Sequence, residues 1–249
     1  MNSSDNKLKQ AAKLIKTSKR TSAFTGAGIS VESGIPPFRG ENGIWNQYDP
    51  SLLELGSFLA QPEESWPLIK KIFYDSMGKA QPNPAHKSLA EMERQGFLDC
   101  IITQNIDGLH QKAGSSNVHE FHGSVTRFIC TGCGSWFATG SLRLDSRPPA
   151  CRECRHLLKP DFVFFGEAIP EAAIVPSFEE TRKSDLFLVI GTTGEVMPAN
   201  LVPQQAKEFG ATIIEINPQA SRYTDRYTDL FLQGKASEIL TRLAGLLDL

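Results

Sequence analysis

Residues 99–110 read DCIITQNIDGLH, and this stretch decides the fold class. Its first half is a short apolar run that ends at Thr103, where polar side chains begin. A continuous apolar run of this length is typical of a strand buried on both faces, because a half-exposed strand alternates apolar and polar residues. We therefore predict a buried strand over residues 99–103 that leads into a polar loop.

Other predicted strands, and predicted helices between them, lie on both sides of this stretch in the sequence. Further strands are predicted over residues 21–24, 185–190, 211–217 and 230–232. Amphipathic spacing predicts helices over residues 7–20, 86–95, 199–209 and 236–247, and a helical segment within residues 50–80 that the prolines around Asn83 end. Strands that alternate with helices predict an α/β fold with a doubly wound parallel sheet that is covered on both faces.

Polar residues gather in the loops that follow these strands. The loops span residues 25–40, 103–110, 191–194 and 217–218, and we expect residues 26–40 to be irregular because they are rich in glycine and proline. In a doubly wound sheet the ligand lies at the carboxyl ends of the strands. The sequence therefore predicts a binding site where these loops meet.

The overall composition excludes several classes of protein. The 249 residues allow one large domain, or one domain with a smaller insertion, and the formal net charge of −2 favours neither nucleic acid nor a membrane surface as a partner. No run of 18 apolar residues occurs, and residues 1–20 lack the apolar core of a secretory signal. We expect a cytoplasmic protein with no membrane partner and no direct binding of nucleic acid.

Four of the five cysteines form two CxxC pairs, at Cys130 and Cys133 and at Cys151 and Cys154. Four thiolates from two such pairs form a closed tetrahedral site of the structural type, which leaves no open position for water. We therefore predict one structural Zn²⁺ per chain in a small zinc ribbon within residues 127–165. The remaining cysteine, Cys100, falls in an apolar run and is expected to be a buried, unreactive thiol.

The other motifs have a functional and a structural interpretation, and taken singly they leave both open. Gly26-Ala27-Gly28 could admit a pyrophosphate or could be a plain turn. The side chains after the strand at 99–103 could hold a ribose or could cap a turn. His122 before Gly123 could be a general base or a structural histidine. The other histidines, His86, His110, His119 and His156, compete with it for that role.

Taken in order, however, the motifs of this chain resemble those of the sirtuins, the NAD-dependent protein lysine deacylases. The resemblance covers nearly the whole chain. It rests on Gly26-Ala27-Gly28-Ile29-Ser30, Ser33-Gly34-Ile35-Pro36, Phe38-Arg39-Gly40, Thr103-Gln104-Asn105-Ile106-Asp107, Leu109-His110, Ala113-Gly114, His122-Gly123, the four paired cysteines, Pro160-Asp161, Phe165-Gly166-Glu167, Gly191-Thr192 and Asn217.

The resemblance implies a Rossmann-like NAD-binding domain and a smaller domain built from two modules. The large domain would comprise residues 1–40, 85–125 and 160–249, the helical module residues 41–84, and the zinc-binding module residues 126–159. NAD and an acyl-lysine protein or peptide would enter the cleft from opposite sides. The products would be nicotinamide and O-acetyl-ADP-ribose, and no particular oligomeric state is implied.

The resemblance also assigns roles to individual residues. His122 would be the general base on the ribose hydroxyls, with Asn105 as a second catalytic residue. NAD and its nicotinamide end would be bound by Gly26, Ala27, Gly28, Phe38, Arg39, Gln104, Asn105 and Asp107, and its ribose and adenine end by Gly191, Thr192, Thr193, Asn217 and Ala236. The backbone of the peptide would be sandwiched as an added strand between Val163, Phe164, Phe165 and Gly166 on one side and Gly194, Glu195 and Val196 on the other.

The chain departs from the family pattern at three positions. Pro37 replaces the usual Asp before the Phe-Arg pair, and Thr193 replaces the usual Ser. In relatives that prefer succinyl groups, a Tyr-x-x-Arg motif supplies an arginine for the acyl carboxylate, whereas Tyr74 is followed here by Met77 at that spacing. We therefore expect a preference for acetyl or longer uncharged acyl groups.

Two other functions compete with deacylation. A mono-ADP-ribosyltransferase on the same scaffold would transfer the nucleotide to a protein side chain, and the change at Pro37 leaves room for it. A nucleic-acid-binding zinc ribbon is the second alternative, because several basic residues lie in or near that segment. They are Arg143, Arg147, Arg152, Arg155 and His156. Such binding would weaken steeply with salt and would survive the substitution His122→Ala.

Overall fold

The larger part of the molecule is built around a six-stranded parallel sheet. A computed structural model describes residues 3–38 and 43–249. The strands are β1 (Thr21–Thr25), β2 (Cys100–Thr103), β3 (Val118–Glu120), β7 (Leu186–Ile190), β8 (Thr212–Asn217) and β9 (Leu230–Gln233), in the order β3-β2-β1-β7-β8-β9. Strand order reverses at the pair β1 and β7, which makes a crevice at their carboxyl ends the expected ligand site of a doubly wound sheet.

The sheet is apolar on both faces, as the uninterrupted apolar runs predict. In β7, Leu186, Leu188 and Ile190 belong to one core, whereas Phe187 and Val189 belong to the other. Successive side chains of a strand point to opposite faces, so one run of five apolar residues supplies both cores.

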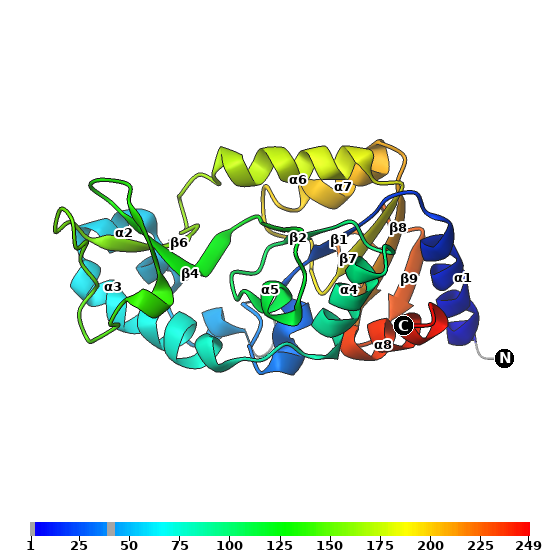
Figure 1. Ribbon diagram of the computed structural model, residues 1–249, viewed down its shortest axis with the longest axis horizontal. Helices are drawn as coiled ribbons and strands as arrows, with labels where there is room; N and C mark the ends of the chain where they lie inside the picture. The colour runs from blue at the N-terminus through cyan, green and yellow to red at the C-terminus, as the bar shows by residue number, and fades with distance from the viewer. Residues whose placement is uncertain (1–2, 39–42) are drawn as a thin grey trace.

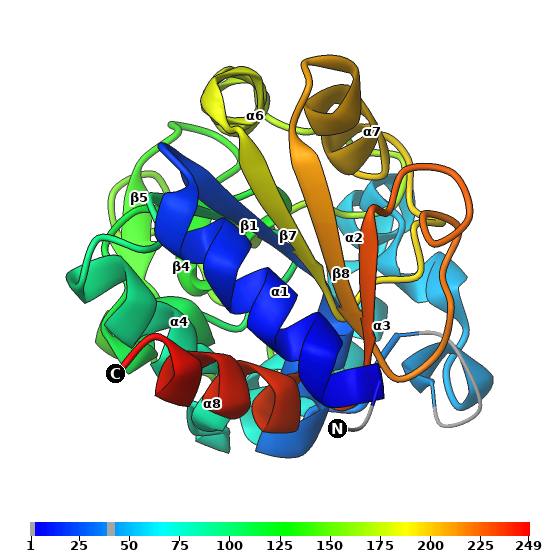
Figure 2. The same cartoon turned by 90° about the vertical axis from the view of Figure 1, so that its right-hand side faces the viewer.

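Helices cover both faces (Figure 2). The first face is covered by α1 (Ser3–Thr17), α4 (Pro84–Arg94) and α8 (Ala236–Leu246), and the second by α6 (Glu171–Lys183) and α7 (Leu201–Glu208). The short helix α5 (Leu109–Ala113) packs against α4. Asn83 caps α4 by accepting from the backbone N–H groups of Ala85 and His86, so the proline-rich stretch ends one helical segment and also begins the next helix.

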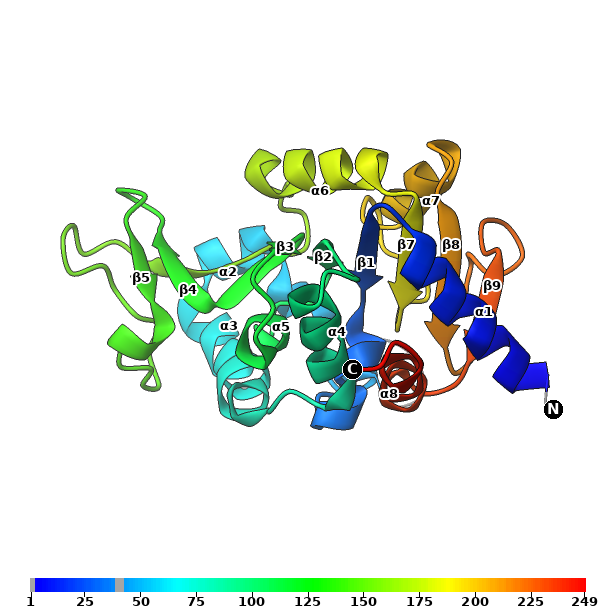
Figure 3. The ribbon, with the colours of Figure 1, turned by 45° about the vertical axis from the view of Figure 1, so that its right-hand side comes forward.

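The smaller part lies at the end of the molecule opposite the two termini (Figures 1 and 3). It contains α2 (Leu55–Ala60), α3 (Pro62–Ile69), a π-helical turn over Lys70–Ser76, and an antiparallel sheet of β4 (Gly123–Cys130), β5 (Trp136–Ala138) and β6 (Leu158–Phe162) in the order β5-β4-β6. A third core joins the helices to the sheet through large side chains such as Trp66, Phe58 and Phe128. Short 3₁₀ helices span Ile44–Asn46, Pro50–Leu53, Met77–Lys79 and Thr139–Ser141.

The α/β class and the parallel sheet are confirmed, and two local expectations need correction. Residues 26–40 are not wholly irregular, because a 3₁₀ helix spans Ala27–Ser33. The strand β3 and the helix α6 were not predicted. The division into modules stays a prediction from the sequence, and its boundaries at residues 125–126 and 159–160 lie within β4 and β6.

Candidate active site

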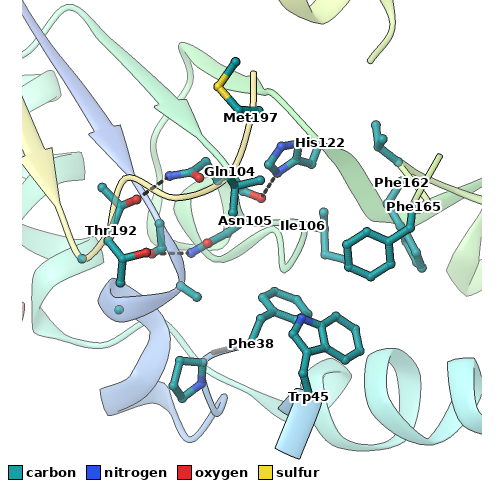
Figure 4. Close-up of a pocket in the computed structure, with 18 of the residues that line it drawn as sticks. Phe38, Trp45, Gln104, Asn105, Ile106, His122, Phe162, Phe165, Thr192 and Met197 are labelled. Atoms are coloured by element: carbon teal, nitrogen blue, oxygen red, sulfur yellow. Dashed lines mark hydrogen bonds between the residues drawn. The ribbon is translucent and has the colours of Figure 1, made fainter. Parts of the chain in front are cut away.

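A cavity of about 790 Å³ opens at the carboxyl edge of the large sheet and extends to the smaller part. Its walls come from the loops after β1, β2, β7 and β8, from His122 at the start of β4, and from the segment after β6. Figure 4 shows ten of these side chains by name. The loops that the sequence singled out therefore meet around one cavity, as predicted from the topology.

The glycine turn after β1 packs directly against the loop after β7. The N–H of Gly28 donates to the carbonyl of Gly191 at 2.8 Å, and a Cβ on Gly28 would lie 2.7 Å from the Cα of Gly191. Gly191 itself has a φ of +63°, and a side chain there would collide with the backbone of Ile29. Glycine is thus required for the contact between two loops at the switch point, in addition to any role in leaving room for a ligand.

Gln104 and Asn105 are held firmly on the floor of the cavity (Figure 4). The Gln104 amide donates to the hydroxyl of Thr192 at 3.0 Å. The Asn105 amide donates to the carbonyl of Gly26 and to the hydroxyl of Ser30, both at 3.1 Å. Because both N–H groups of Asn105 are used within the protein, its carbonyl oxygen is the atom left for a ligand.

His122 is arranged as a neutral base. Its Nδ1 lies 2.9 Å from the carbonyl oxygen of Gln104, which can only accept, so Nδ1 carries the proton and Nε2 keeps a lone pair. Burial lowers the pKa of the imidazole, and the hydrogen bond to Gln104 partly opposes that shift. The ring lines the cavity, so a neutral acceptor is available there near pH 7.

Asp107 lies beneath the cavity and is not among its lining residues. Its carboxylate accepts from the hydroxyl of Ser30 at 2.7 Å and from the N–H of Leu109 at 2.9 Å. Burial raises the pKa of this carboxyl group, and the two hydrogen bonds counteract the rise. Asp107 is therefore placed to support Asn105 through Ser30, and a direct contact of Asp107 with NAD stays a prediction from the sequence.

Asn217 and Thr192 line the far end of the cavity beside the loop after β8. The Asn217 amide donates to the carbonyl of Thr192 at 3.1 Å and to the carboxylate of Glu215 at 2.9 Å. Glu215 is fully buried and also accepts from the hydroxyls of Thr224 and Thr228. With its N–H groups so used, Asn217 offers its carbonyl oxygen to hydroxyl donors such as those of a ribose.

Aromatic rings form the other end of the cavity, which we term the aromatic wall: Phe38, Trp45, Phe73, Phe162 and Phe165. Phe38 stacks on Trp45 at 5.4 Å between ring centroids, and Trp45 meets the edge of Phe165 at 5.5 Å. Among the described residues that line the cavity, none is lysine or arginine. This end of the cavity therefore favours an uncharged apolar group.

Tyr74 and Met77 do not take part in this wall. The Tyr74 ring stacks on Phe128 at 5.3 Å within the core of the smaller part, and neither residue is among the described ones that line the cavity. Burial raises the pKa of the Tyr74 hydroxyl far above its ordinary value. The position that carries tyrosine in the Tyr-x-x-Arg motif thus contributes to packing in this chain.

Residues 163–166, directly after β6, form one edge of the cavity, which we call the lip. The N–H of Val163 donates to the carbonyl of His122 at 2.9 Å, and Phe165 exchanges hydrogen bonds with Leu53 and Leu55. In the part of the chain that the structure describes, no intramolecular hydrogen bond is made by the carbonyl of Val163. Opposite this lip, Val196 lines the cavity, whereas Gly194 and Glu195 do not.

Most of the predicted site residues meet at this cavity. Those that line it are Gly26, Ala27, Gly28, Phe38, Gln104, Asn105, His122, Val163, Phe164, Phe165, Gly166, Gly191, Thr192, Thr193, Val196 and Asn217. Arg39 lies outside the described residues, and Ala236 is the buried first residue of α8, away from the lining. Trp45, Met197 and residues 219–221 also line the cavity, and sequence reasoning missed them because none of them belongs to a recognisable motif.

The four paired cysteines converge in the smaller part. All four Sγ atoms lie within 4.8 Å of one another, with Cys130 and Cys154 at 3.3 Å and Cys133 and Cys151 at 3.8 Å. Zn–S bonds of about 2.3 Å in a tetrahedron place sulfurs roughly 3.8 Å apart, so these residues fit a Zn²⁺ ion. None of the four lines the cavity, which agrees with a structural role for the metal.

The search for membrane spans gave a negative result. No helix in residues 3–38 and 43–249 is both long and apolar enough to cross a bilayer.

Comparison with known proteins identifies many relatives. A sequence model described as "Sir2 family" matches residues 26–198. NAD-dependent protein deacetylase 1 of Pyrobaculum aerophilum is 43% identical over 238 residues, which cover 95% of this chain and 93% of the relative. The NAD-dependent protein deacylase of Pyrococcus furiosus is 43% identical over 246 residues, with 95% and 96% covered.

Solved structures agree over the same length. A mutant Sir2 homologue in complex with ADP-ribose superposes with a TM-score of 0.92 at 39% identity, over 100% of this chain and 97% of the other. A Sir2 homologue in complex with NAD gives 0.89 at 40% identity, over 96% and 93%. A complex described as Sir2 with a p53 peptide and NAD⁺ gives 0.87 at 32% identity, over 96% and 97%.

Proposed function

The chain belongs to the Sir2 family and is an NAD-dependent protein deacylase, and on this premise we propose how its cavity carries the reaction. The substrates are an acyl-lysine protein or peptide, NAD and one water, and the products are the deacylated lysine, nicotinamide and O-acyl-ADP-ribose. The observation that carries this proposal is the hydrogen bond from His122 Nδ1 to the Gln104 carbonyl, because it fixes a neutral base within the cavity.

NAD, when bound, supplies the ribose carbon that accepts the acyl oxygen and releases nicotinamide. Asn105, Gln104 and Ala27 bind the nicotinamide end, and Thr192, Thr193 and Asn217 bind the adenosine end. His122 Nε2 is the acceptor that would take a proton from a ribose hydroxyl of bound NAD, so that this oxygen could attack the acyl carbon. The imidazolium that forms is stabilised by the Gln104 carbonyl, which accepts the hydrogen bond from Nδ1.

The acyl-lysine enters from the side of the aromatic wall, and its peptide backbone adds as a strand beside Val163 to Gly166. The free carbonyl of Val163 supports this mode, because an added strand needs backbone groups that the protein has not already paired. Gly194, Glu195 and Val196 complete the sandwich from the opposite loop. A main-chain interaction of this kind tolerates many peptide sequences.

The acyl group is acetyl or a longer uncharged chain. The aromatic wall offers a succinyl carboxylate no cation among the described residues, and desolvating an unpaired carboxylate is costly. Acetyl and succinyl versions of one peptide should therefore differ in kcat/KM by at least about tenfold in favour of acetyl, which corresponds to about 1.4 kcal/mol. A clear preference for the succinyl peptide would contradict this assignment.

Mass spectrometry of an acetyl-lysine peptide with the purified protein tests the proposed function. We expect acetyl loss that depends on NAD, together with an acetylated ADP-ribose product. His122→Ala should lower the rate by roughly 10²- to 10⁴-fold, as expected when a general base is removed. His156→Ala is the matched control, because His156 is exposed in the zinc-ribbon segment, and it should react like the unmodified chain.

Two further assays on the unmodified chain and on His122→Ala, of label transfer from NAD and of nucleic-acid binding at varied salt, separate the alternatives. NAD consumption with label on protein and no acetyl loss would point to ADP-ribosyl transfer, which the names of the relatives do not favour. Steeply salt-dependent nucleic-acid binding that survives His122→Ala would point to the zinc-ribbon alternative. A cytoplasmic location and the division into three modules stay predictions from the sequence.

A further inference from the structure

Lys159, at the second position of β6, is a buried lysine with a complete set of partners. Its side chain is only 8% exposed. The ammonium group donates to the carbonyls of Pro160 at 3.0 Å and Phe162 at 2.7 Å, and to the carboxylate of Glu167 at 3.0 Å. A lysine ammonium has three N–H donors, so every donor has an acceptor.

The ring of Phe164 completes this environment. Its centroid lies 4.7 Å from the Lys159 nitrogen, within the range of a cation–π contact. Glu167 in turn accepts from the N–H of Phe164 at 2.9 Å, and the N–H of Glu167 donates to the carbonyl of Phe164 at 3.1 Å. One ammonium group therefore contacts four residues of the segment 160–167 and closes it into a compact turn.

This turn carries the lip of the cavity. Val163 follows Phe162, whose carbonyl Lys159 holds, and its N–H donates to the carbonyl of His122. Phe165 follows Phe164 and is paired with Leu53 on the smaller part. The ammonium group thus lies on the inner side of the segment, while the outer side presents backbone groups and Phe165 to the cavity.

We propose that Lys159 is a positioning residue for the acyl-lysine substrate, which holds the peptide-binding segment Val163–Gly166 in register with His122. The inference rests on the proposed function, because it takes that segment as the site of strand addition. An added strand binds through main-chain hydrogen bonds, and these require the receiving strand to be held in one conformation. Lys159 itself touches neither the peptide nor NAD.

A charge is needed at this position because Glu167 is its partner. Substitution by methionine keeps the length and apolar packing of the stem but leaves the Glu167 carboxylate and two carbonyls without their shared donor. The ion pair is partly buried, because the Glu167 side chain is 26% exposed, and losing its cation leaves the carboxylate charge without a partner of opposite sign in that setting. Arginine keeps the charge with a different donor geometry and should recover part of the function.

Arg127 offers a matched control on the neighbouring strand. It pairs with Asp161 at 2.9 Å, but its side chain is 47% exposed, so the pair is solvated and should contribute little. Arg127→Met therefore removes a basic side chain and an ion pair from the same sheet without disturbing the segment 163–166.

The test measures binding of an acetyl-lysine peptide and of ADP-ribose separately, by fluorescence anisotropy and calorimetry, on the full chain with zinc bound. In Lys159→Met, the Kd for the peptide should rise about tenfold or more, which corresponds to the loss of a buried charge partner. The Kd for ADP-ribose should change by no more than about twofold. A change that small means that no contact between the protein and ADP-ribose has been lost. Lys159→Arg should lose less peptide affinity than Lys159→Met, and Arg127→Met should bind like the unmodified chain.

Three results would overturn the inference. They are unchanged peptide affinity in folded Lys159→Met, an equal loss of peptide and ADP-ribose affinity, and an unmodified chain that does not bind the peptide at all. Deacetylation by the unmodified chain is assayed in parallel. If the peptide binds but is not deacetylated, the proposed function fails while the effect of Lys159 on binding is still decided.

Discussion

Asn217 illustrates how a buried residue determines what its neighbour presents to a ligand. The carboxylate of Glu215 has no solvent exposure and accepts from Asn217, Thr224 and Thr228. It therefore directs the amide N–H of Asn217 inward and leaves the carbonyl oxygen for the cavity. A buried negative charge at this end also suits a ribose hydroxyl better than a phosphate group.

Replacing Glu215 with glutamine should weaken this arrangement. The glutamine oxygen can still accept from Asn217, but its NH₂ group then faces the hydroxyls of Thr224 and Thr228, which lose their buried acceptor, and an unsatisfied buried donor costs about 1–3 kcal/mol. We expect the KM for NAD to rise by about tenfold or more, whereas peptide affinity stays unchanged. Initial rates at varied NAD, with Glu208→Gln as an exposed control on α7, would check this, and an unchanged KM would contradict it.

The pH dependence of the reaction follows from His122. The base must be neutral, and burial lowers its pKa from the ordinary value of 6.5. A depressed pKa keeps the imidazole neutral to lower pH, so the acid limb of kcat/KM should fall below pH 6.5 and activity should be lost only as pH drops further. A pH–rate profile between pH 4.5 and 8 measures this limb, and a midpoint above 6.5 would exclude the prediction.

Motifs in the sequence predicted which residues belong to the site, but they did not predict the hydrogen bonds between those residues. Gln104, Asn105 and His122 were recognisable by their place in ordered motifs, and the structure brings all three to one cavity. Nothing in the sequence indicated that the Gln104 backbone carbonyl would fix the tautomer of His122. Trp45 and Met197 escaped prediction because an isolated apolar residue carries no positional signal.

At the level of elements, β4 connects the metal site to the base. It begins at Gly123, directly after His122, and ends at Cys130, the first of the four clustered cysteines. A Cβ at Gly123 would lie 2.3 Å from the carbonyl of Asp161 on β6, so the two strands are in close contact at that end. Folding of the zinc-ribbon segment should therefore influence the position of His122.

Cys133→Ser should remove the metal and, with it, activity. Three thiolates bind Zn²⁺ more weakly than four, and structural zinc sites contribute directly to folding free energy. We expect metal analysis to show clearly less Zn²⁺ than the one ion per chain of the unmodified protein. Thermal unfolding should begin at a lower temperature, because the metal no longer stabilises the folded state. Full activity in a zinc-free protein would refute this.

Cys100→Ala is the matched control for that substitution. Cys100 lies in β2, outside the cluster, and burial raises the pKa of its thiol to about 12, so it is a poor metal ligand and a poor nucleophile. Cys100→Ala should therefore retain zinc and activity. If it lost zinc, the metal content would depend on packing of the large sheet and not only on the four clustered cysteines.

A helix or strand was predictable from the sequence when it was long and when its burial left a clear apolar pattern. Long apolar runs such as β7 were found because both faces of the strand are buried. β3 was missed because it has three half-buried residues, and α6 because Pro176 lies within it and its apolar pattern is weak. The 3₁₀ helix over Ala27–Ser33 is not predictable in this way, because the glycines that flank it are also typical of turns.

In the whole molecule, the cavity is lined by loops of the large sheet and by side chains of the smaller part. A ligand that contacts both parts should stabilise them together. At a concentration of ADP-ribose one hundred times its Kd, binding adds about 2.7 kcal/mol. For a chain of this size that corresponds to a rise in Tm of roughly 5–10 °C.

Differential scanning fluorimetry can measure this rise. Asn217→Ala should reduce it at the same ligand concentration, because a larger Kd lowers the ratio of ligand concentration to Kd, and the stabilisation depends on the logarithm of that ratio. A shift of equal size in both proteins would mean that ADP-ribose does not contact the loop after β8.

The burial of Lys159 has a consequence for its chemical reactivity. An amine whose three N–H groups are all engaged and whose stem is enclosed cannot be attacked by an acylating reagent until the segment 160–167 opens. Its labelling rate would then equal the intrinsic rate multiplied by the open fraction, as in amide hydrogen exchange. The protein thus contains a built-in reporter of local opening at its substrate lip, readable by mass spectrometry against an exposed lysine such as Lys87.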